Sequence, residues 1–326
     1  MHQRCLVTGG TGFVGSHLVE GLLTAGRPVT CTVRSTSDPR WLKGTGAQLV
    51  PCDLRRVDEI KKALFNVDLV FHVAGAINAS SREEFLQVNA GLTLNLLGAC
   101  ADQEIPPRFV YVSSQAAAGP SRGVVPRDEG MPPEPVSDYG RSKLAGEEGV
   151  RAYSGRLPWV IVRPPVVYGP RDRAMLTVFK LARSPIRPTP GSNRPLSLIY
   201  VEDLVEGMLK AGTSDAADGR VYFLAHPEPT TMGGLGDALA RVMGKRGVTV
   251  PIPAPVIKGA ALISETAMGL LGRTAALNRD KAREITQPGW VCSTEKAERD
   301  LGFTATTPHE EGLAATAAWY RAAGWL

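Results

Sequence analysis

The stretch Thr8-Gly9-Gly10-Thr11-Gly12-Phe13-Val14-Gly15 decides the fold of this 326-residue chain. It follows the apolar run Cys5-Leu6-Val7, which is typical of a buried strand, and it opens a segment with apolar residues at helical spacing, Val14, Leu18 and Leu22. Its three spaced glycines permit a tight turn, a close approach of backbone to a pyrophosphate and close packing of helix on strand. The free N–H groups of the helix N-terminus favour anions. We therefore expect a dinucleotide-binding unit at the start of the chain.

Short β-rich runs alternate with helical stretches through the first half of the chain. The predicted strands are residues 5–7, 29–33, 48–50, 69–73, 109–112 and 159–162. The predicted helices are residues 12–25, 57–64 and 83–102, and another helix precedes the sixth strand. This alternation predicts an α/β fold, a Rossmann-type doubly wound parallel sheet with at least six strands.

The second half of the chain has a different texture. Pro and Gly punctuate residues 184–195, and short helices such as 201–211 follow. We expect a dinucleotide-binding Rossmann domain over residues 1–169. Residues 170–326 are expected to form a smaller, mainly substrate-binding lobe, with some segments returning to the Rossmann domain.

The stretch 255–271 places apolar side chains at helical spacing. They are Val256, Ala260, Ile263, Ala267 and Leu270, with Lys258 and Glu265 elsewhere. Such spacing is typical of an amphipathic helix packed on the body of the protein. The alternative is a lid over an apolar substrate pocket, or a contact with a membrane surface.

The composition indicates an ordinary globular protein. Hydrophobic residues make up 43% of the chain and charged residues 21%, and the net charge of +5 comes without a basic stripe. The five cysteines show no C-x-x-C spacing, which indicates free thiols in a reducing compartment. There is no charged-then-apolar leader and no apolar run of about 18 residues. We expect a cytoplasmic protein with no nucleic-acid partner, no stable membrane span and no metal site.

Arg34 stands at the end of the second predicted strand, followed by Ser35. NAD-binding proteins usually carry an acidic residue at this point to accept from the ribose hydroxyls. A guanidinium pairs with a 2′-phosphate, whereas a carboxylate would repel it. The sequence therefore favours NADP(H), with Arg40 and Lys43 as further sources of positive charge. The alternative is a solvated arginine with no ligand.

Two further loops are candidate cofactor walls. Cys52-Asp53-Leu54 follows the third strand, where the carboxylate of Asp53 is placed to accept from an adenine amino group. Val73-Ala74-Gly75 follows the fourth strand, where small residues let the ribose and pyrophosphate pass close to the backbone. Each stretch taken alone is an ordinary loop.

The candidate chemistry lies in Tyr139 and Lys143, which form Tyr-x-x-x-Lys on a predicted helix. That spacing places both side chains on one face. A phenol with a pKa near 10 needs a nearby ammonium to act as an acid or base at neutral pH. Ser114, at the end of the fifth strand, adds a hydroxyl that can bind a substrate oxygen.

Together these motifs resemble the extended short-chain dehydrogenases/reductases, which include sugar-nucleotide epimerases, dihydroflavonol reductases and 3β-hydroxysteroid dehydrogenases. The resemblance covers nearly the whole chain, with the motifs in the right order. The matching segments are Thr8–Gly15, Cys52–Leu54, Val70–Gly75, Val88-Asn89, Tyr111–Ser114, Tyr139–Lys143, Arg163–Pro170 and Tyr200–Leu204.

The resemblance implies a role for each matching residue. Tyr139 protonates the carbonyl oxygen in reduction, Lys143 lowers the pKa of Tyr139 and holds the nicotinamide ribose, and Ser114 orients the substrate oxygen. Pro164 to Val167 meets the carboxamide, and Asn89 has a supporting role. The expected cofactor-binding residues are Gly9, Thr11, Gly12, Phe13, Val14, Gly15, Arg34, Ser35, Asp53, Leu54, Val73, Ala74, Gly75, Tyr139, Lys143, Pro164, Val166 and Val167. A homodimer built on the helices of Asn89 and Tyr139 is also implied.

We interpret the chain as an NADP(H)-dependent ketone reductase for a largely apolar small molecule. Sugar-nucleotide enzymes of the superfamily typically place an Asn where this chain has Val166, and an Arg where it has Leu196. Arg171 and Arg194 are possible replacement cations. The rival enzyme is a sugar-nucleotide epimerase or dehydratase. The rival outside enzymes is an NADP(H)-binding redox-sensing regulator, against which the intact Ser114, Tyr139 and Lys143 argue.

Overall fold

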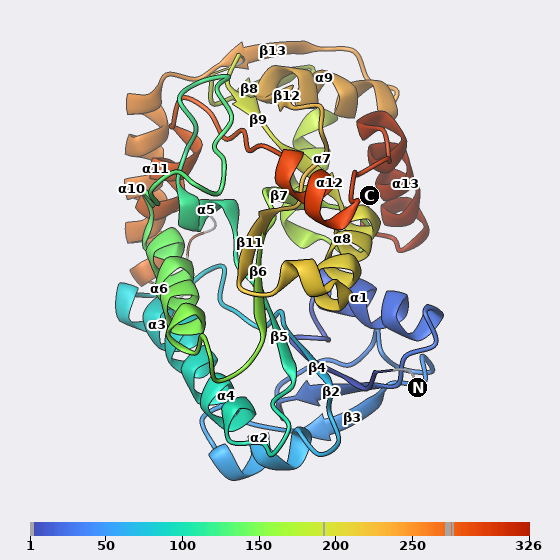
Figure 1. Cartoon of the computed structure of the whole chain (residues 1–326). Helices are drawn as coiled ribbons and strands as arrows, with labels where there is room; N and C mark the ends of the chain where they lie inside the picture. The colour runs from blue at the N-terminus through green and yellow to red at the C-terminus, as the bar shows by residue number, and fades with distance from the viewer. Residues whose placement is uncertain (1–2, 192, 271–274, 276) are drawn as a thin grey trace.

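The central feature of the fold is a seven-stranded parallel sheet, in the order β11-β6-β5-β4-β1-β2-β3. A computed structural model describes residues 3–191, 193–270, 275 and 277–326 (Figure 1). The strands are β1 (Cys5–Thr8), β2 (Val29–Val33), β3 (Gln48–Pro51), β4 (Leu69–His72), β5 (Arg108–Val112), β6 (Trp159–Arg163) and β11 (Arg220–Phe223). The predicted doubly wound parallel sheet is confirmed. Because the strand order reverses between β1 and β4, their carboxyl ends form the crevice where such sheets bind ligands.

Helices cover both faces of the sheet. α1 (Phe13–Thr24), α8 (Val201–Thr213) and α12 (Glu295–Leu301) share one buried core with the sheet. α2 (Val57–Ala63), α4 (Leu92–Ala101) and α6 (Asp138–Ala152) share the other. Cys5 and Val7 belong to the first core and Leu6 to the second, as strand alternation requires. The layered arrangement brings α6 beside β5 and β6.

The predicted helix 83–102 is not α-helical throughout. The structure has α3 (Arg82–Leu86), a π-helical turn (Gln87–Gly91) and then α4. At the turn, the carbonyl of Asn89 accepts hydrogen bonds from Thr93 Oγ1 at 2.8 Å and from the Tyr111 hydroxyl at 3.1 Å. A single π turn inside an α-helix is typical of a functional region, and hydrophobic periodicity alone does not reveal it.

A second lobe has its own buried core, seen in the upper half of Figure 1. Three short strand pairs support it: β7 (Val166–Tyr168) with β10 (Leu198–Tyr200), β8 (Ile186–Thr189) with β13 (Val248–Pro251), and β9 (Pro195–Leu196) with β12 (Thr230–Thr231). Its helices α7 (Arg173–Ala182), α9 (Met232–Val242) and α13 (His309–Ala322) enclose Phe179, Leu239 and Tyr320. α8, β11 and α12, although they lie in the second half of the sequence, pack with the Rossmann sheet.

The face predicted for helix 255–271 is wrong. α10 (Ala254–Leu270) packs through Ile257 and Ala261 against Ala282 of α11 (Arg279–Ile285). Val256 and Ile263, on the face expected to be buried, are 58% and 72% exposed. The helix carries only Lys258 and Glu265 as charges, so two faces are apolar and periodicity cannot select between them. Leu271 and the side chain of Leu270 lie outside the described residues.

The structure bears on two expectations, the state of the cysteines and the presence of a membrane span. All five cysteines are free and buried, as small apolar side chains. Within the described ranges, no helix combines the length and the apolar character needed to cross a membrane.

A buried ion pair ties α6 to β6. Arg163 donates to Glu147 twice, from Nε at 2.8 Å and from Nη2 at 2.6 Å, and both side chains are almost fully buried. Ser113 adds a third bond, from Oγ to the same carboxylate at 2.6 Å. Loss of one partner would leave a buried charge unpaired, at a cost of about 3–5 kcal/mol. The catalytic-helix candidate is therefore fixed rigidly on the sheet.

Candidate active site

The glycine-rich turn has the geometry that a dinucleotide site needs. Gly9 has a φ of +75°, and the N–H of Gly12 donates to its carbonyl at 3.0 Å. A Cβ on Gly15 would lie 2.1 Å from that carbonyl oxygen, so only glycine lets α1 pack this closely on the turn. No side chain caps the N-terminus of α1, and its first turn has no acidic residue. These N–H groups can bind a pyrophosphate.

Arg34 follows β2 on an exposed turn, which a bond from its backbone N–H to Ser37 Oγ at 3.0 Å helps to hold. Within the described part of the chain, its guanidinium makes no hydrogen bond or ion pair. Arg40 differs, because its Nε donates to Asp38 at 2.6 Å. Arg34 is therefore a cation of this loop that can pair with a ligand without breaking an existing contact.

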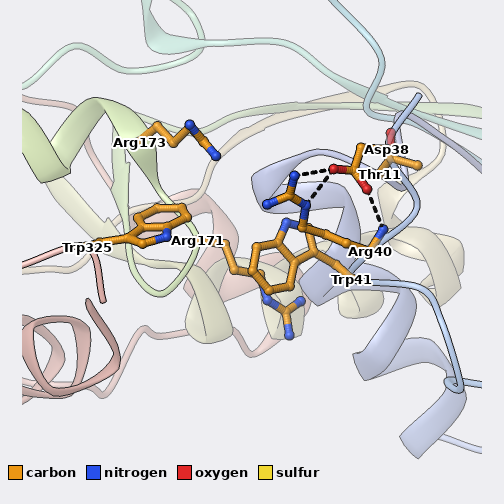
Figure 2. Close-up of a pocket in the computed structure, with 7 residues that line it drawn as sticks. All are labelled: Thr11, Asp38, Arg40, Trp41, Arg171, Arg173 and Trp325. Atoms are coloured by element: carbon orange, nitrogen blue, oxygen red, sulfur yellow. Dashed lines mark hydrogen bonds and ion pairs between the residues drawn. The ribbon is translucent and has the colours of Figure 1, made fainter. Parts of the chain in front are cut away.

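A basic cavity of about 190 Å³ borders the glycine-rich turn (Figure 2). It is lined by Thr11, Asp38, Arg40, Trp41, Arg171, Arg173 and Trp325. Arg171 comes from the second lobe, donates to Ser16 at 3.0 Å and Glu20 at 2.7 Å on α1, and lies over the Trp41 ring at 5.0 Å. Arg171 is thus committed to joining the lobe to the Rossmann domain.

Two loops after β3 and β4 complete the predicted cofactor walls. Asp53 is held by Arg55, whose Nη2 donates at 2.6 Å, and this bond lowers the pKa of the carboxyl to about 2. Leu54 is buried. In the other loop, a Cβ on Gly75 would lie 2.9 Å from Asn89 Oδ1 and 3.7 Å from Lys143 Nζ, so this loop runs beside α6.

Asn89 connects the loop after β4 to α6. Its Oδ1 accepts from the N–H of Ala76 at 2.8 Å, and its Nδ2 donates to the Ala76 carbonyl and to Ser142 Oγ, both at 2.9 Å. These contacts are what the predicted supporting role would rest on. A buried amide with all these partners satisfied holds two walls of the site in register.

Ser114 and Tyr139 are brought together. Ser114 is the N-cap of α5 (Gln115–Ala118), where its Oγ accepts from the N–H of Ala116 at 3.1 Å, and its side chain lies near enough to the Tyr139 hydroxyl to lower the pKa of the phenol. Burial raises the pKa of Tyr139 to about 12, the Ser114 side chain opposes this rise, and the charge of Glu284 adds to it. Ser113 points instead to Glu147, so the second serine of the pair faces the tyrosine.

Lys143 is almost fully buried. Its Nζ donates to the Val112 carbonyl at 2.7 Å and stands 4.4 Å from the centre of the Tyr111 ring. Burial lowers the pKa of Lys143 to about 7, and the Glu147 carboxylate opposes this shift. The phenol pKa is therefore set by burial, Ser114 and Glu284, and no direct bond from Lys143 to Tyr139 is present.

The segment after β6 passes directly beside the serine. The carbonyl of Pro164 accepts from the N–H of Gln115 at 2.8 Å, and Val166 and Val167 continue into β7. Val166 is 44% exposed. Leu196 is buried in the core of the second lobe, and Arg194 donates to the Ile285 carbonyl at 2.8 Å.

Two carboxylates that no motif singles out also reach this region. Asp280 and Glu284 of α11 bond the first turn of α6, more than 140 residues away in sequence. A contact at such separation leaves no local signal in one sequence. Within the described residues, no cluster of three or more His, Cys, Asp or Glu is arranged to hold a metal ion.

Comparison with known proteins places the chain. The sequence model of the NAD dependent epimerase/dehydratase family matches residues 5–225. A ceramide reductase of Caulobacter vibrioides is 31% identical over 332 residues, which cover 98% of this chain and 95% of that protein. The 4-hydroxy-2-methyl-3-oxo-4-farnesyl-3,4-dihydroquinoline-1-oxide ketoreductase of Stigmatella aurantiaca is 28% identical over 333 residues, or 95% of each chain.

A solved structure has the same fold as this chain. MoeE5 in complex with UDP-glucuronic acid and NAD superposes with a TM-score of 0.77 and 26% identity, over 98% of this chain and 99% of that one. This chain therefore belongs to the NAD dependent epimerase/dehydratase family, within the extended short-chain dehydrogenases/reductases. The comparisons support an oxidoreductase that uses a nicotinamide cofactor.

Proposed function

We propose that this protein is an NADP(H)-dependent ketone reductase with Tyr139 as its general acid and base. The observation that carries the proposal is the placement of the Ser114 side chain beside the Tyr139 hydroxyl, at the crevice bordered by the loop of Gly75 and by Lys143. A polar pair at the carboxyl ends of the strands is where a reacting carbonyl can meet both a proton donor and a dinucleotide.

The chemistry divides between cofactor and chain. A bound nicotinamide dinucleotide supplies the hydride that reaches the carbonyl carbon. Ser114 donates a hydrogen bond that orients the carbonyl oxygen, and Tyr139 gives its proton to that oxygen as the carbon–oxygen double bond becomes a single bond. Lys143 would hold the nicotinamide ribose, and in its ammonium form its nearby charge would stabilise the phenolate left on Tyr139 without a direct bond to it. Oxidation of the alcohol reverses each step.

The proposed preference for NADP(H) rests on Arg34. Its guanidinium is exposed and uncommitted, and the walls beyond it carry Arg40, Arg171 and Arg173. A dianionic 2′-phosphate gains from such surroundings and from a bidentate contact with a guanidinium. Lys43 is exposed in the same loop. Gly9 to Gly15, Ser35 and the loops of Asp53 and Val73 are proposed to hold the rest of the dinucleotide.

We expect Arg34→Asp to weaken NADPH use about tenfold to a hundredfold, because a charged contact worth roughly 1.5–3 kcal/mol is lost. The measurement is kcat/KM for NADPH and NADH in the wild type and the variant. Lys62→Asp, which makes the same charge change at an exposed position of α2, is the control and should leave both values within twofold. Equal use of NADH and NADPH by the wild type would contradict the assignment.

We also propose that the substrate is largely apolar and carries no nucleotide diphosphate. Val166 and Leu196 stand where a diphosphate would need an amide and a cation, and a buried, unpaired diphosphate costs several kcal/mol. The two possible replacement cations are engaged elsewhere, since Arg171 bonds Ser16 and Glu20 and Arg194 bonds the Ile285 carbonyl. The names of the ceramide reductase and the farnesyl-quinoline ketoreductase agree with an apolar substrate.

Calorimetric titration of the NADP⁺-loaded protein separates the two substrate classes. UDP-, GDP- and dTDP-sugars should show no binding at micromolar concentrations, because the aliphatic side chains of Val166 and Leu196 cannot pair their phosphates. Long-chain ketones or the corresponding alcohols should bind, since burial of apolar surface contributes about 25 cal/mol per Å². Micromolar binding of any nucleotide sugar would instead favour the sugar-nucleotide epimerase or dehydratase.

Tyr139→Phe tests the mechanism itself. The variant lacks only the hydroxyl, so we expect an unchanged fold and NADPH affinity but a turnover about 10²–10⁴-fold lower, the usual worth of general acid catalysis. Steady-state ketone reduction and NADPH fluorescence titration measure the two quantities. Tyr153→Phe, on the same helix's C-terminal side, is the matched control. Turnover at the wild-type rate in Tyr139→Phe would show that another group supplies the proton.

The non-enzymatic alternative, a redox-sensing regulator that binds NADP(H), is disfavoured by the Ser114–Tyr139 pair, which dinucleotide binding alone does not require. We also propose a homodimer built on the helix that contains Asn89 and on α6, as the resemblance implies, and a cytoplasmic location, as the composition indicates. Light scattering and cell fractionation test these two proposals directly.

A further inference from the structure

A short helix from the far end of the chain lies against the start of the catalytic helix. Figure 1 shows α11 beside the end of α6 that lies next to α5. Asp280 of α11 accepts hydrogen bonds from the N–H of Asp138 at 2.7 Å and from the N–H of Tyr139 at 3.2 Å, one on each carboxylate oxygen. These two N–H groups belong to the first turn of α6, where no bond within the helix is available to them.

Glu284, one turn further along α11, reaches the N-cap of the same helix. Its Oε1 accepts from Ser137 Oγ at 2.6 Å, while Ser137 Oγ itself accepts from the N–H of Gly140 at 2.9 Å. Glu284 is 9% exposed, so this chain of two bonds is shielded from water. Asp280 and Glu284 together therefore bind residues 137–139 directly. Through the Ser137 hydroxyl, Glu284 is also linked to the N–H of Gly140.

α11 is itself held in place from several directions. Trp290 Nε1 donates to the Glu284 carbonyl at 2.9 Å, and Arg194 donates to the carbonyl of the next residue. On the side of α10, Arg279 pairs with Glu265 at 2.9 Å. The two carboxylates thus stand on a supported element and not on a free loop.

Two carboxylates at the start of a helix have a clear electrostatic effect. The N-terminus carries a partial positive charge, so the anions stabilise the first turn and fix its orientation. Tyr139 is in that turn, and its hydroxyl must lie within hydrogen-bond reach of Ser114. A small tilt of the turn would move the phenol oxygen away from the reacting carbonyl.

We propose that Asp280 and Glu284 are positioning residues that hold Tyr139 in register with Ser114. This inference rests on the proposed role of Tyr139 as the acid and base. The C-terminal half of the chain then contributes to the catalytic arrangement, because the two residues that position the tyrosine belong to α11. Neither carboxylate contacts the glycine-rich turn, so neither should affect dinucleotide binding.

The charged and titratable groups around Tyr139 come from three elements. α6 contributes Asp138 and Lys143, β5 contributes Tyr111, and α11 contributes Asp280 and Glu284. Lys281 and Arg283 of α11 are paired with Glu284 at 2.9 Å and Asp280 at 3.6 Å. Of the charged groups, Glu284 raises the phenol pKa, so its neutralisation should ease loss of the Tyr139 proton.

The first test compares Asp280→Asn with Glu298→Gln. An asparagine keeps the size but has only one acceptor oxygen for the two N–H groups, so we expect kcat to fall about tenfold, with the NADPH dissociation constant within twofold of the wild type. Glu298→Gln neutralises an exposed carboxylate of α12 that, among the described residues, makes no bond to α6 or α11, and it should leave kcat within twofold. An equal loss in both variants, or none in either, would overturn the proposal.

The second test uses Glu284→Gln, which retains an acceptor for Ser137 and removes the charge. In alcohol oxidation the rate rises with pH as Tyr139 loses its proton. A lower phenol pKa should therefore move this rise to lower pH. A role limited to packing would leave the profile in place, and an unmoved profile would contradict the assignment of Glu284.

The third test needs no turnover. Hydrogen exchange of the peptide that holds residues 137–141 should accelerate on the order of tenfold in Asp280→Asn and not in Glu298→Gln. Unchanged exchange in Asp280→Asn would refute the positioning contact. Faster exchange in a protein whose wild type reduces no carbonyl compound would support the contact and refute the proposed function, so the two failures are distinguishable.

Discussion

The buried ion pair between Glu147 and Arg163 is the interaction on which the rest of the site depends. It fixes α6 to β6 in a place where water cannot compensate either charge, so the helix cannot slide or tilt without exposing one of them. Ser113 bonds the same carboxylate, which leaves its neighbour Ser114 to face Tyr139. One electrostatic constraint therefore sets the relation between the serine on the sheet and the tyrosine on the helix.

The cofactor side of the crevice is tied to the same helix by a neutral contact. Asn89 bonds the loop after β4 and Ser142 of α6, so the surface that faces the dinucleotide and the surface that carries Tyr139 move together. The two carboxylates of α11 bind the N-terminus of α6. In this account the reactive hydroxyl is positioned from the sheet, from the cofactor loop and from the far end of the chain.

The sequence predicted the parallel sheet, the glycine-rich turn and the meeting of Ser114 with Tyr139, because each depends on local patterns and on strand ends that share one edge. It predicted one helix over 83–102, where a π turn intervenes, and the wrong packed face for α10. Periodicity records where apolar residues recur and not which of two apolar faces finds a partner. The contacts of Asp280 and Glu284 with α6 could not be predicted, since nothing near either residue marks a partner so distant in sequence.

The central claim is that hydride leaves the nicotinamide and stays on the substrate carbon. Reduction of a long-chain ketone with NADPH that carries deuterium at the transferred position of C4 tests it directly, with the product analysed by mass spectrometry. The account predicts one deuterium on the new carbinol carbon and one NADP⁺ formed for each alcohol. Alcohol product without deuterium would contradict it. An alcohol substrate returned as its epimer, with no net change in NADPH, would also contradict it and would indicate an epimerase.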